Sequence, residues 1–174
     1  MALMSRGVVL CVVWVGLAAC SPDLNWRDVR SDDGRLVHWF PCRPVQQVRT
    51  LPLAGRDRRV ELRVCDAAGA SWAQMRVELE RPDEADAVGQ VLLQASAAKL
   101  GTVAAVRPVS LAGASRTPGP ARATMQRRGP DGRQLRAGVL VFGVGGAVYQ
   151  LTALGEALTE ESIETFMASV RVMP

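Results

Sequence analysis

Histidine is nearly absent from this sequence. The 174 residues include a single one, His38. This excludes a zinc site built from several histidines and leaves one candidate for a catalytic pair that uses histidine. The length also excludes a multidomain enzyme, because single domains commonly span about 100–200 residues. Hydrophobic residues make up 48% of the chain, which is ordinary for a packed domain.

The sequence also lacks an apolar run long enough to cross a membrane as a helix. The uncharged run over residues 7–20, preceded by Arg6, is shorter than the roughly 17–25 residues that a spanning helix requires. This layout is typical of a secretory signal. Its last four residues, Leu17-Ala18-Ala19-Cys20, resemble the lipobox of bacterial lipoproteins, in which signal peptidase II cuts before the cysteine. The resemblance implies a signal peptide over residues 1–19 and a lipid-bearing, palmitate-type anchor on Cys20.

Two other interpretations of this leader stay open, a plain secretory signal and a buried helix of a cytosolic protein. The second is disfavoured because the run has no helix cap at its start and ends at a Ser21-Pro22 turn. In the enterobacterial convention, aspartate after the lipidated cysteine retains a lipoprotein in the inner membrane. Because Ser21 stands there, we expect the periplasmic face of the outer membrane.

Four cysteines are present, and the leader accounts for two of them. Cys11 leaves with the signal and Cys20 takes the lipid, so Cys42 and Cys65 remain in the mature chain. Two thiols in an exported chain favour a disulfide, since the periplasm is oxidising. Free thiols remain an alternative, as does a metal site with His38, although that site would need a fourth ligand.

The mature chain divides into a tether and one domain. Residues 20–34 are polar, with turn formers at both ends, and are expected to be the lipidated N-terminus and tether. Leu24, Trp26 and Val29 are the tether residues that can dock on the domain. Residues 35–174 are expected to form a single α+β periplasmic domain.

Alternating apolar residues predict two hairpins. In the first, residues 60–65 and 73–79 flank a turn at residues 66–69, with one face buried and a solvated face that carries charges and Cys65. The charges of this face belong to Glu61, Arg63, Arg76 and Glu78. In the second, residues 135–142 and 147–154 flank Gly145-Gly146, a turn that places Phe142 opposite Tyr149. Further strands are expected over residues 35–40, 45–53 and 121–128.

Two helices are predicted by their start signals. Pro82 and the acidic residues after it open the first helix, and Gly101 is its expected end. Thr159 caps the second, which has an apolar stripe from Ile163 to Val170. Residues 102–120 form a connection that can add an edge strand.

The element order predicts an α+β fold, a mostly antiparallel curved sheet packed by two helices. It resembles the PsbP-like α/β/α sandwich of small exported lipoproteins and thylakoid-lumen proteins. The resemblance covers residues 35–172 and rests on this order and on the ending Glu164-Thr-Phe-Met-Ala-Ser-Val-Arg171. It implies a fold and transfers no catalytic residue.

Arginine supplies 20 of the 21 basic residues, which we attribute to genome composition. Because the leader predicts export from the cytoplasm, nucleic acid is not an expected partner. Five arginines cluster around the Pro130 turn and form a candidate contact patch for anionic lipid, lipopolysaccharide or an acidic partner, or else a plain solvated loop. They are Arg122, Arg127, Arg128, Arg133 and Arg136.

No pattern of residues predicts catalysis. His38 lies in a strand-like run without an identifiable partner, and the serines match no nucleophile-elbow motif. We therefore expect a non-enzymatic accessory without cofactor or metal, which contacts the membrane through its lipid and meets an envelope protein or lipid. The alternative is a small-ligand or lipid-binding module on the concave face of the sheet, favoured if an apolar cavity of about 300 Å3 or more is present.

Overall fold

A computed structural model of the chain describes residues 24–129 and 131–174. The strands in these residues are β1 (Arg27–Arg30), β2 (Leu36–Phe40), β3 (Val45–Leu53), β4 (Arg56–Ala67), β5 (Ala70–Glu78), β6 (Thr102–Pro108), β7 (Ala121–Arg128), β8 (Gln134–Val144), β9 (Ala147–Gly155) and β10 (Arg171–Val172). The helices are η1 (Pro82–Glu84), α1 (Ala85–Leu100) and α2 (Glu160–Ala168). The predicted signal peptide and Cys20 lie outside the described residues.

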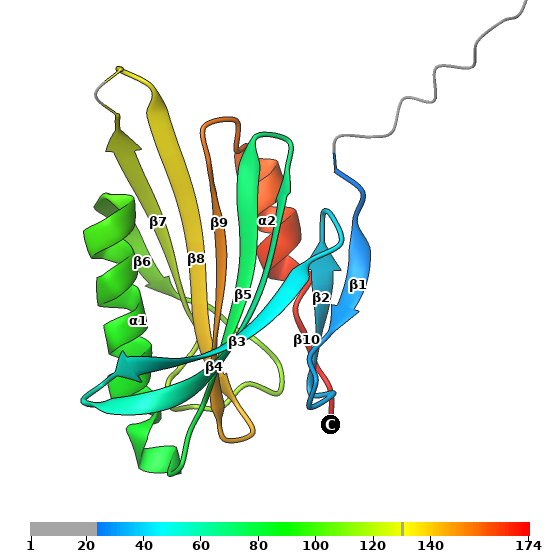
Figure 1. Ribbon diagram of the computed structural model, residues 1–174, viewed down its shortest axis with the longest axis vertical. Helices are drawn as coiled ribbons and strands as arrows, with labels where there is room; N and C mark the ends of the chain where they lie inside the picture. The colour runs from blue at the N-terminus through cyan, green and yellow to red at the C-terminus, as the bar shows by residue number, and fades with distance from the viewer. Residues whose placement is uncertain (1–23, 130) are drawn as a thin grey trace, which may run out of the picture.

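Seven strands form one antiparallel sheet in the order β3-β4-β5-β9-β8-β7-β6. Helix α1 lies on one face, and α2 lies on the other beside a small sheet of β1, β2 and β10 (Figure 1). Strands β3 and β4 bend toward the α1 side, so that face is concave (Figure 1). The predicted α+β class, with a mostly antiparallel sheet packed by two helices, is confirmed.

The hairpin of β8 and β9 has the predicted register. Gly145 and Gly146 both have positive φ, 53° and 82°, which glycine adopts without steric cost. Phe142 is therefore opposite Tyr149, and their rings stack with centroids 5.6 Å apart. Val139 and Val141 lie on the opposite face in the core beneath α1, so both faces of these central strands are buried.

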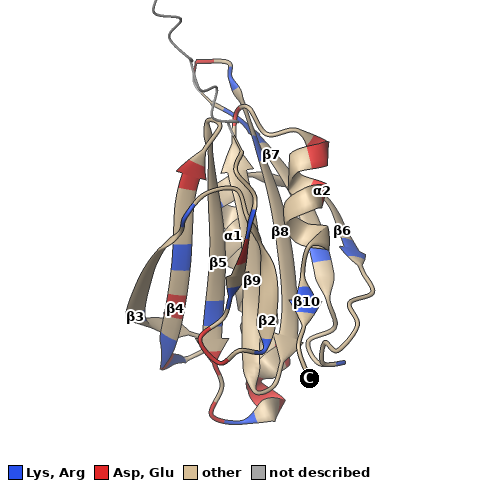
Figure 2. Ribbon diagram, turned by 90° about the vertical axis from the view of Figure 1, so that its right-hand side faces the viewer, with Lys and Arg blue, Asp and Glu red and all other residues tan. Residues whose placement is uncertain are grey.

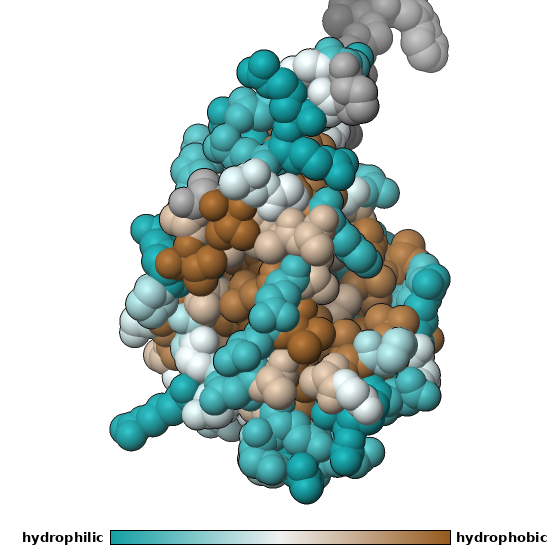
Figure 3. Space-filling view, turned by 90° about the vertical axis from the view of Figure 1, so that its left-hand side faces the viewer, coloured by the Kyte–Doolittle hydropathy of each residue, from teal (hydrophilic) through white to brown (hydrophobic). Residues whose placement is uncertain are grey.

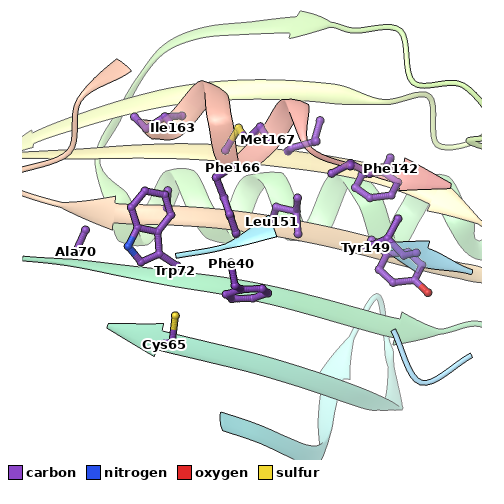
Figure 4. Close-up of a cluster of buried hydrophobic side chains, with 14 of the residues drawn as sticks. Phe40, Cys65, Ala70, Trp72, Phe142, Tyr149, Leu151, Ile163, Phe166 and Met167 are labelled. Carbon is purple, nitrogen blue, oxygen red and sulfur yellow. The ribbon is translucent and has the colours of Figure 1, made fainter. Parts of the chain in front are cut away.

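The core between the sheet and α2 contains five aromatic side chains, Phe40, Trp72, Phe142, Tyr149 and Phe166 (Figure 4). The Phe166 ring on α2 lies edge-on to Trp72 of β5, with centroids 5.2 Å apart, and to Phe40 of β2, at 5.4 Å. All three side chains are almost completely buried. They fasten the helix, the large sheet and the small sheet to one another.

Both helices begin where the sequence predicts, whereas α2 ends at Ala168, before the last residue of the predicted stripe, Val170. The hydroxyl of Thr159 accepts from the backbone of Ser162 at 3.1 Å, which completes a capping box at the start of α2. Leu158 and Ile163 are both buried beside this cap. The first helical segment starts at Pro82, and α1 ends at Leu100, followed by the C-cap Gly101, whose φ is 111°.

The described part of the predicted tether belongs to the folded domain, and the predicted docking of Leu24, Trp26 and Val29 is confirmed. Residues 27–30 form β1, which pairs with β2, and Leu24, Trp26 and Val29 pack against the core. The Trp26 ring lies edge-on to Trp72, with centroids 5.6 Å apart. The folded domain therefore begins by residue 24, because this short polar segment carries enough apolar surface to dock.

The solvated face predicted for the first hairpin is wrong. Glu61 faces Arg76 across the strands, as expected, but Glu61 and Arg63 are buried and Glu78 alone among the four charges stays largely exposed. Charged residues occur along β4 and β5, whereas β8 and β9 carry almost none (Figure 2). The loop between β1 and β2 covers these charges, and the alternation of the hairpin itself contains no sign of that cover.

Candidate functional site

The loop between β1 and β2 is fastened to the large sheet by charged hydrogen bonds. Arg63 of β4 donates to the carbonyl of Arg30 at 2.7 Å and to the Asp32 carboxylate. The Asp33 carboxylate accepts from Tyr149 at 2.9 Å and from Arg76 at 3.2 Å. These contacts join the loop and the end of β1 to β4, β5 and β9, so the arrangement closes this face of the sheet.

The pKa values in this network keep Asp33 charged and Tyr149 neutral. Burial raises the pKa of Asp33, but hydrogen bonds from Ser31, the Arg35 backbone and Tyr149, with the charge of Arg76, outweigh it and lower the pKa overall. Burial and the bond to Asp33 raise the pKa of Tyr149 to about 12. Tyr149 is therefore a hydrogen-bond donor at neutral pH. The network has a structural role, because it holds the loop between β1 and β2 against the large sheet.

His38 is completely buried among aromatic rings. Its Nε2 lies 2.7 Å from the amide oxygen of Gln74, and its ring lies 4.8 Å from Phe40 and 5.4 Å from Phe166. The Gln74 oxygen can only accept, so Nε2 carries the hydrogen, while Nδ1 has no partner among the described residues. Burial, assisted by the charge of Arg63, lowers the pKa to about 4. These contacts match an ordinary strand histidine.

The depressed pKa of His38 predicts acid sensitivity. The folded pKa is about 4 and the ordinary value is 6.5, so folding excludes the proton. The stabilisation is complete above pH 6.5 and is lost as the pH falls from 6.5 toward 4. Urea unfolding at steps of pH should show the free energy of unfolding declining through this window.

A His38→Leu variant is the control for this prediction. Its free energy of unfolding should change little between pH 7 and about 4.5, even if the substitution makes the protein more or less stable than the wild type. Asp33 and Glu84, whose pKa values lie below 3.8 and 4.5, act only at lower pH. An equal decline in the variant would assign the effect to another group.

Cys42 and Cys65 form the predicted disulfide. Cys42 follows the end of β2 and Cys65 lies near the end of β4, so the bond joins the small sheet to the large one. Cys65 is buried in the aromatic core. The pairing rules out free thiols and a metal site at these two residues.

The five arginines of the predicted contact patch do not lie together. Arg122 is buried, and its guanidinium pairs with Glu160 at 3.0 Å and with Glu164, both on α2. It lies about 20 Å along β7 from Arg128. Arg122 therefore anchors a helix and offers no surface to a partner.

The other four arginines surround the turn between β7 and β8. Arg133 pairs with Glu156 at 3.3 Å and with Asp131 at 3.3 Å. Arg127 donates to the carbonyl of Lys99 at the end of α1, and strand alternation directs it to the face opposite Arg128. For Arg128 and Arg136 the described residues contain no ion pair. A single patch is not formed.

A groove lies between α1 and the concave face of the sheet. Its walls are mainly apolar, and its volume is about 250 Å3. The apolar lining comes from β3, β5 and α1, namely Leu51, Leu53, Met75, Leu92, Ala95 and Leu100. Apolar side chains are gathered among hydrophilic ones on this side of the molecule (Figure 3). The groove exists because the bent end of β3 approaches the helix across the sheet.

Gln150 of β9 supplies a polar group to this groove. Its amide nitrogen donates to the Ser96 hydroxyl at 3.2 Å and to the Thr152 hydroxyl at 2.9 Å. The Ser96 hydroxyl donates its single hydrogen to the carbonyl of Leu92, at 2.8 Å. The Ser96 oxygen must therefore accept from Gln150. This fixes the orientation of the amide. The amide oxygen is buried and has no partner among the described residues.

The groove was not predictable from the sequence, because its walls come from segments far apart in the chain. One local signal was present: Gln150 and Thr152 share a face of β9 with Val148, and that face is buried against α1. A glutamine in such a strand must find partners inside the protein. The alternation in β9 therefore identifies Gln150 as a buried polar residue. It does not identify the segments that form the opposite wall of the groove.

Neither a metal-binding cluster nor a membrane-spanning helix occurs in the residues that the structure describes. These residues contain no group of three or more His, Cys, Asp or Glu residues placed to hold a metal ion. No helix in residues 24–129 and 131–174 is long and apolar enough to span a membrane.

Comparison with known proteins found no family model that matches this chain and no matching curated protein.

Proposed function

We propose that the protein is a lipid-anchored lipoprotein of the bacterial cell envelope that acts without catalysis. Its single domain would serve as a partner-binding or envelope-maintenance accessory on the periplasmic face of the outer membrane. The observation that carries the proposal is the Cys42–Cys65 disulfide, because such bonds persist in oxidising compartments. It agrees with the export address given by Leu17-Ala18-Ala19-Cys20.

The fold and the buried histidine support this proposal. A helix on each face of an antiparallel sheet is the arrangement of the PsbP-like sandwich, which we propose as the finer fold. The single histidine is enclosed by Phe40 and Phe166, where substrate has no access to it. A non-enzymatic role is the simplest function for such a domain.

Metabolic labelling with palmitate tests the anchor. The wild-type protein should incorporate the label and fractionate with membranes, and Cys20→Ala should do neither. Cys11→Ala is the matched control, since Cys11 lies in the same leader and should leave labelling unchanged. An unlabelled wild-type protein, or a Cys20→Ala variant that remains lipidated, contradicts the proposal.

The groove favours a second candidate function, the binding of a small ligand on the concave face. Its volume of about 250 Å3 is somewhat below the roughly 300 Å3 at which ligand pockets commonly begin. The groove therefore suits a small molecule or one end of a larger one. Crosslinking in the native envelope separates the candidates: a photoreactive residue at Ala95 should capture a small molecule if the groove is used, and a protein if α1 is a docking face.

A further inference from the structure

We propose that the groove binds the end of an aliphatic alcohol, with the alkyl chain against the apolar walls and the hydroxyl donating to the Gln150 amide oxygen. The inference rests on the small-ligand function above and adds the chemistry of the ligand. It does not depend on the membrane anchor.

The unpaired oxygen of Gln150 selects the polar group of the ligand. Ser96 and Thr152 hold the amide nitrogen, so the group left without a partner is an acceptor. A buried acceptor that has lost water without gaining a donor is unfavourable. A hydroxyl supplies the missing donor. A carboxylate or an ether brings only acceptors at neutral pH and leaves the oxygen unmatched.

The volume and the lining select the rest of the ligand. At about 30 Å3 for each atom of water size, a volume of about 250 Å3 holds about eight non-hydrogen atoms. The walls formed by Leu51, Leu53 and Leu100 favour an alkyl chain over a sugar or a nucleotide. Met75 and Lys99 also line the groove, and both have unbranched side chains that can move aside to admit the hydroxyl.

Lys99 offers the competing chemistry. Lys99 is one of the residues that line the groove, so a fatty acid could pair its carboxylate with the Lys99 ammonium group without contacting Gln150. Preference for alcohol over carboxylate therefore reports which residue sets the specificity. The structure assigns this role to Gln150, because its acceptor is buried whereas Lys99 is largely exposed and already solvated.

The test uses the protein as it is isolated from its host, labelled with 13C-methyl methionine. Three probes of similar size are titrated: 1-heptanol, hexyl methyl ether and heptanoate. The Met75 methyl signal should move with 1-heptanol at concentrations severalfold, up to about tenfold, lower than with the other two. Met167, which lies in the core on the opposite face of the sheet, should stay unchanged.

Two variants locate the effect. Gln150→Met keeps the side-chain length but removes the acceptor, so the preference for 1-heptanol should disappear. Ala95→Phe fills the groove and should abolish the response of Met75 to all three probes. Ala98→Phe is its matched control: Ala98 is also exposed on α1 but does not line the groove, so binding should persist.

The outcomes separate the ligand class from the binding function. Equal or stronger movement of Met75 with the ether or heptanoate, or a preference that survives Gln150→Met, overturns the alcohol proposal and leaves small-ligand binding standing. No movement with any probe, a response unaffected by Ala95→Phe, or equal movement of Met167 overturns both.

Discussion

Replacement of Phe166 by alanine is expected to lower the free energy of unfolding by about 4 kcal/mol, the middle of the range for a fully buried phenylalanine. The side chain is completely buried and its ring contacts Trp72, Phe40 and His38. The loss therefore leaves a cavity where α2 and both sheets meet. Urea unfolding followed by tryptophan fluorescence measures the change, because Trp72 lies against the cavity.

Thr165→Ala on the same helix is the control for this prediction. Thr165 is only half-buried, so its truncation should cost less than about 1 kcal/mol. If Phe166→Ala lowered the free energy of unfolding by no more than Thr165→Ala does, the aromatic core would not be what holds α2 in place.

Removal of the disulfide by Cys42→Ala and Cys65→Ala together is expected to lower the free energy of unfolding by about 3 kcal/mol. The two cysteines are 23 residues apart in sequence, and opening a loop of this length restores chain entropy to the unfolded state. Denaturant unfolding of the oxidised wild-type protein against the double variant gives the difference.

Reduction provides an independent control for the disulfide. Dithiothreitol should lower the stability of the wild-type protein toward that of the double variant and leave the variant itself unchanged. A double variant as stable as the oxidised protein would mean that the bond adds nothing to the packing around Cys65.

Local signals predicted most of the elements but missed the short strands β1 and β10. The Gly145-Gly146 turn fixed the register of β8 and β9, and Thr159 fixed the start of α2, because turns and caps depend on residues a few positions apart. The Cys42–Cys65 pair was predictable by elimination, since two other cysteines belong to the leader.

Contacts between distant segments were not predictable in the same way. Tyr149 bonds to Asp33, 116 residues away, and this contact helps to bury a face of β4 and β5 that alternation assigned to solvent. Alternation gives the side of the sheet on which a residue lies, but not what covers that side. The arginine patch failed for a related reason: Arg127 and Arg128 are neighbours in sequence and face opposite ways in β7.

The early start of β1 has a consequence for how the domain would sit at a membrane. With Cys20 anchored as proposed, the four residue steps to Leu24, where the folded domain begins, reach at most about 14 Å, about a quarter of the length of a tether that ends at residue 35. The domain would be held close to the lipid headgroups on its β1 side. Because α1 lies on the other side of the large sheet (Figure 1), the groove would then open away from the bilayer, toward molecules that arrive through the periplasm.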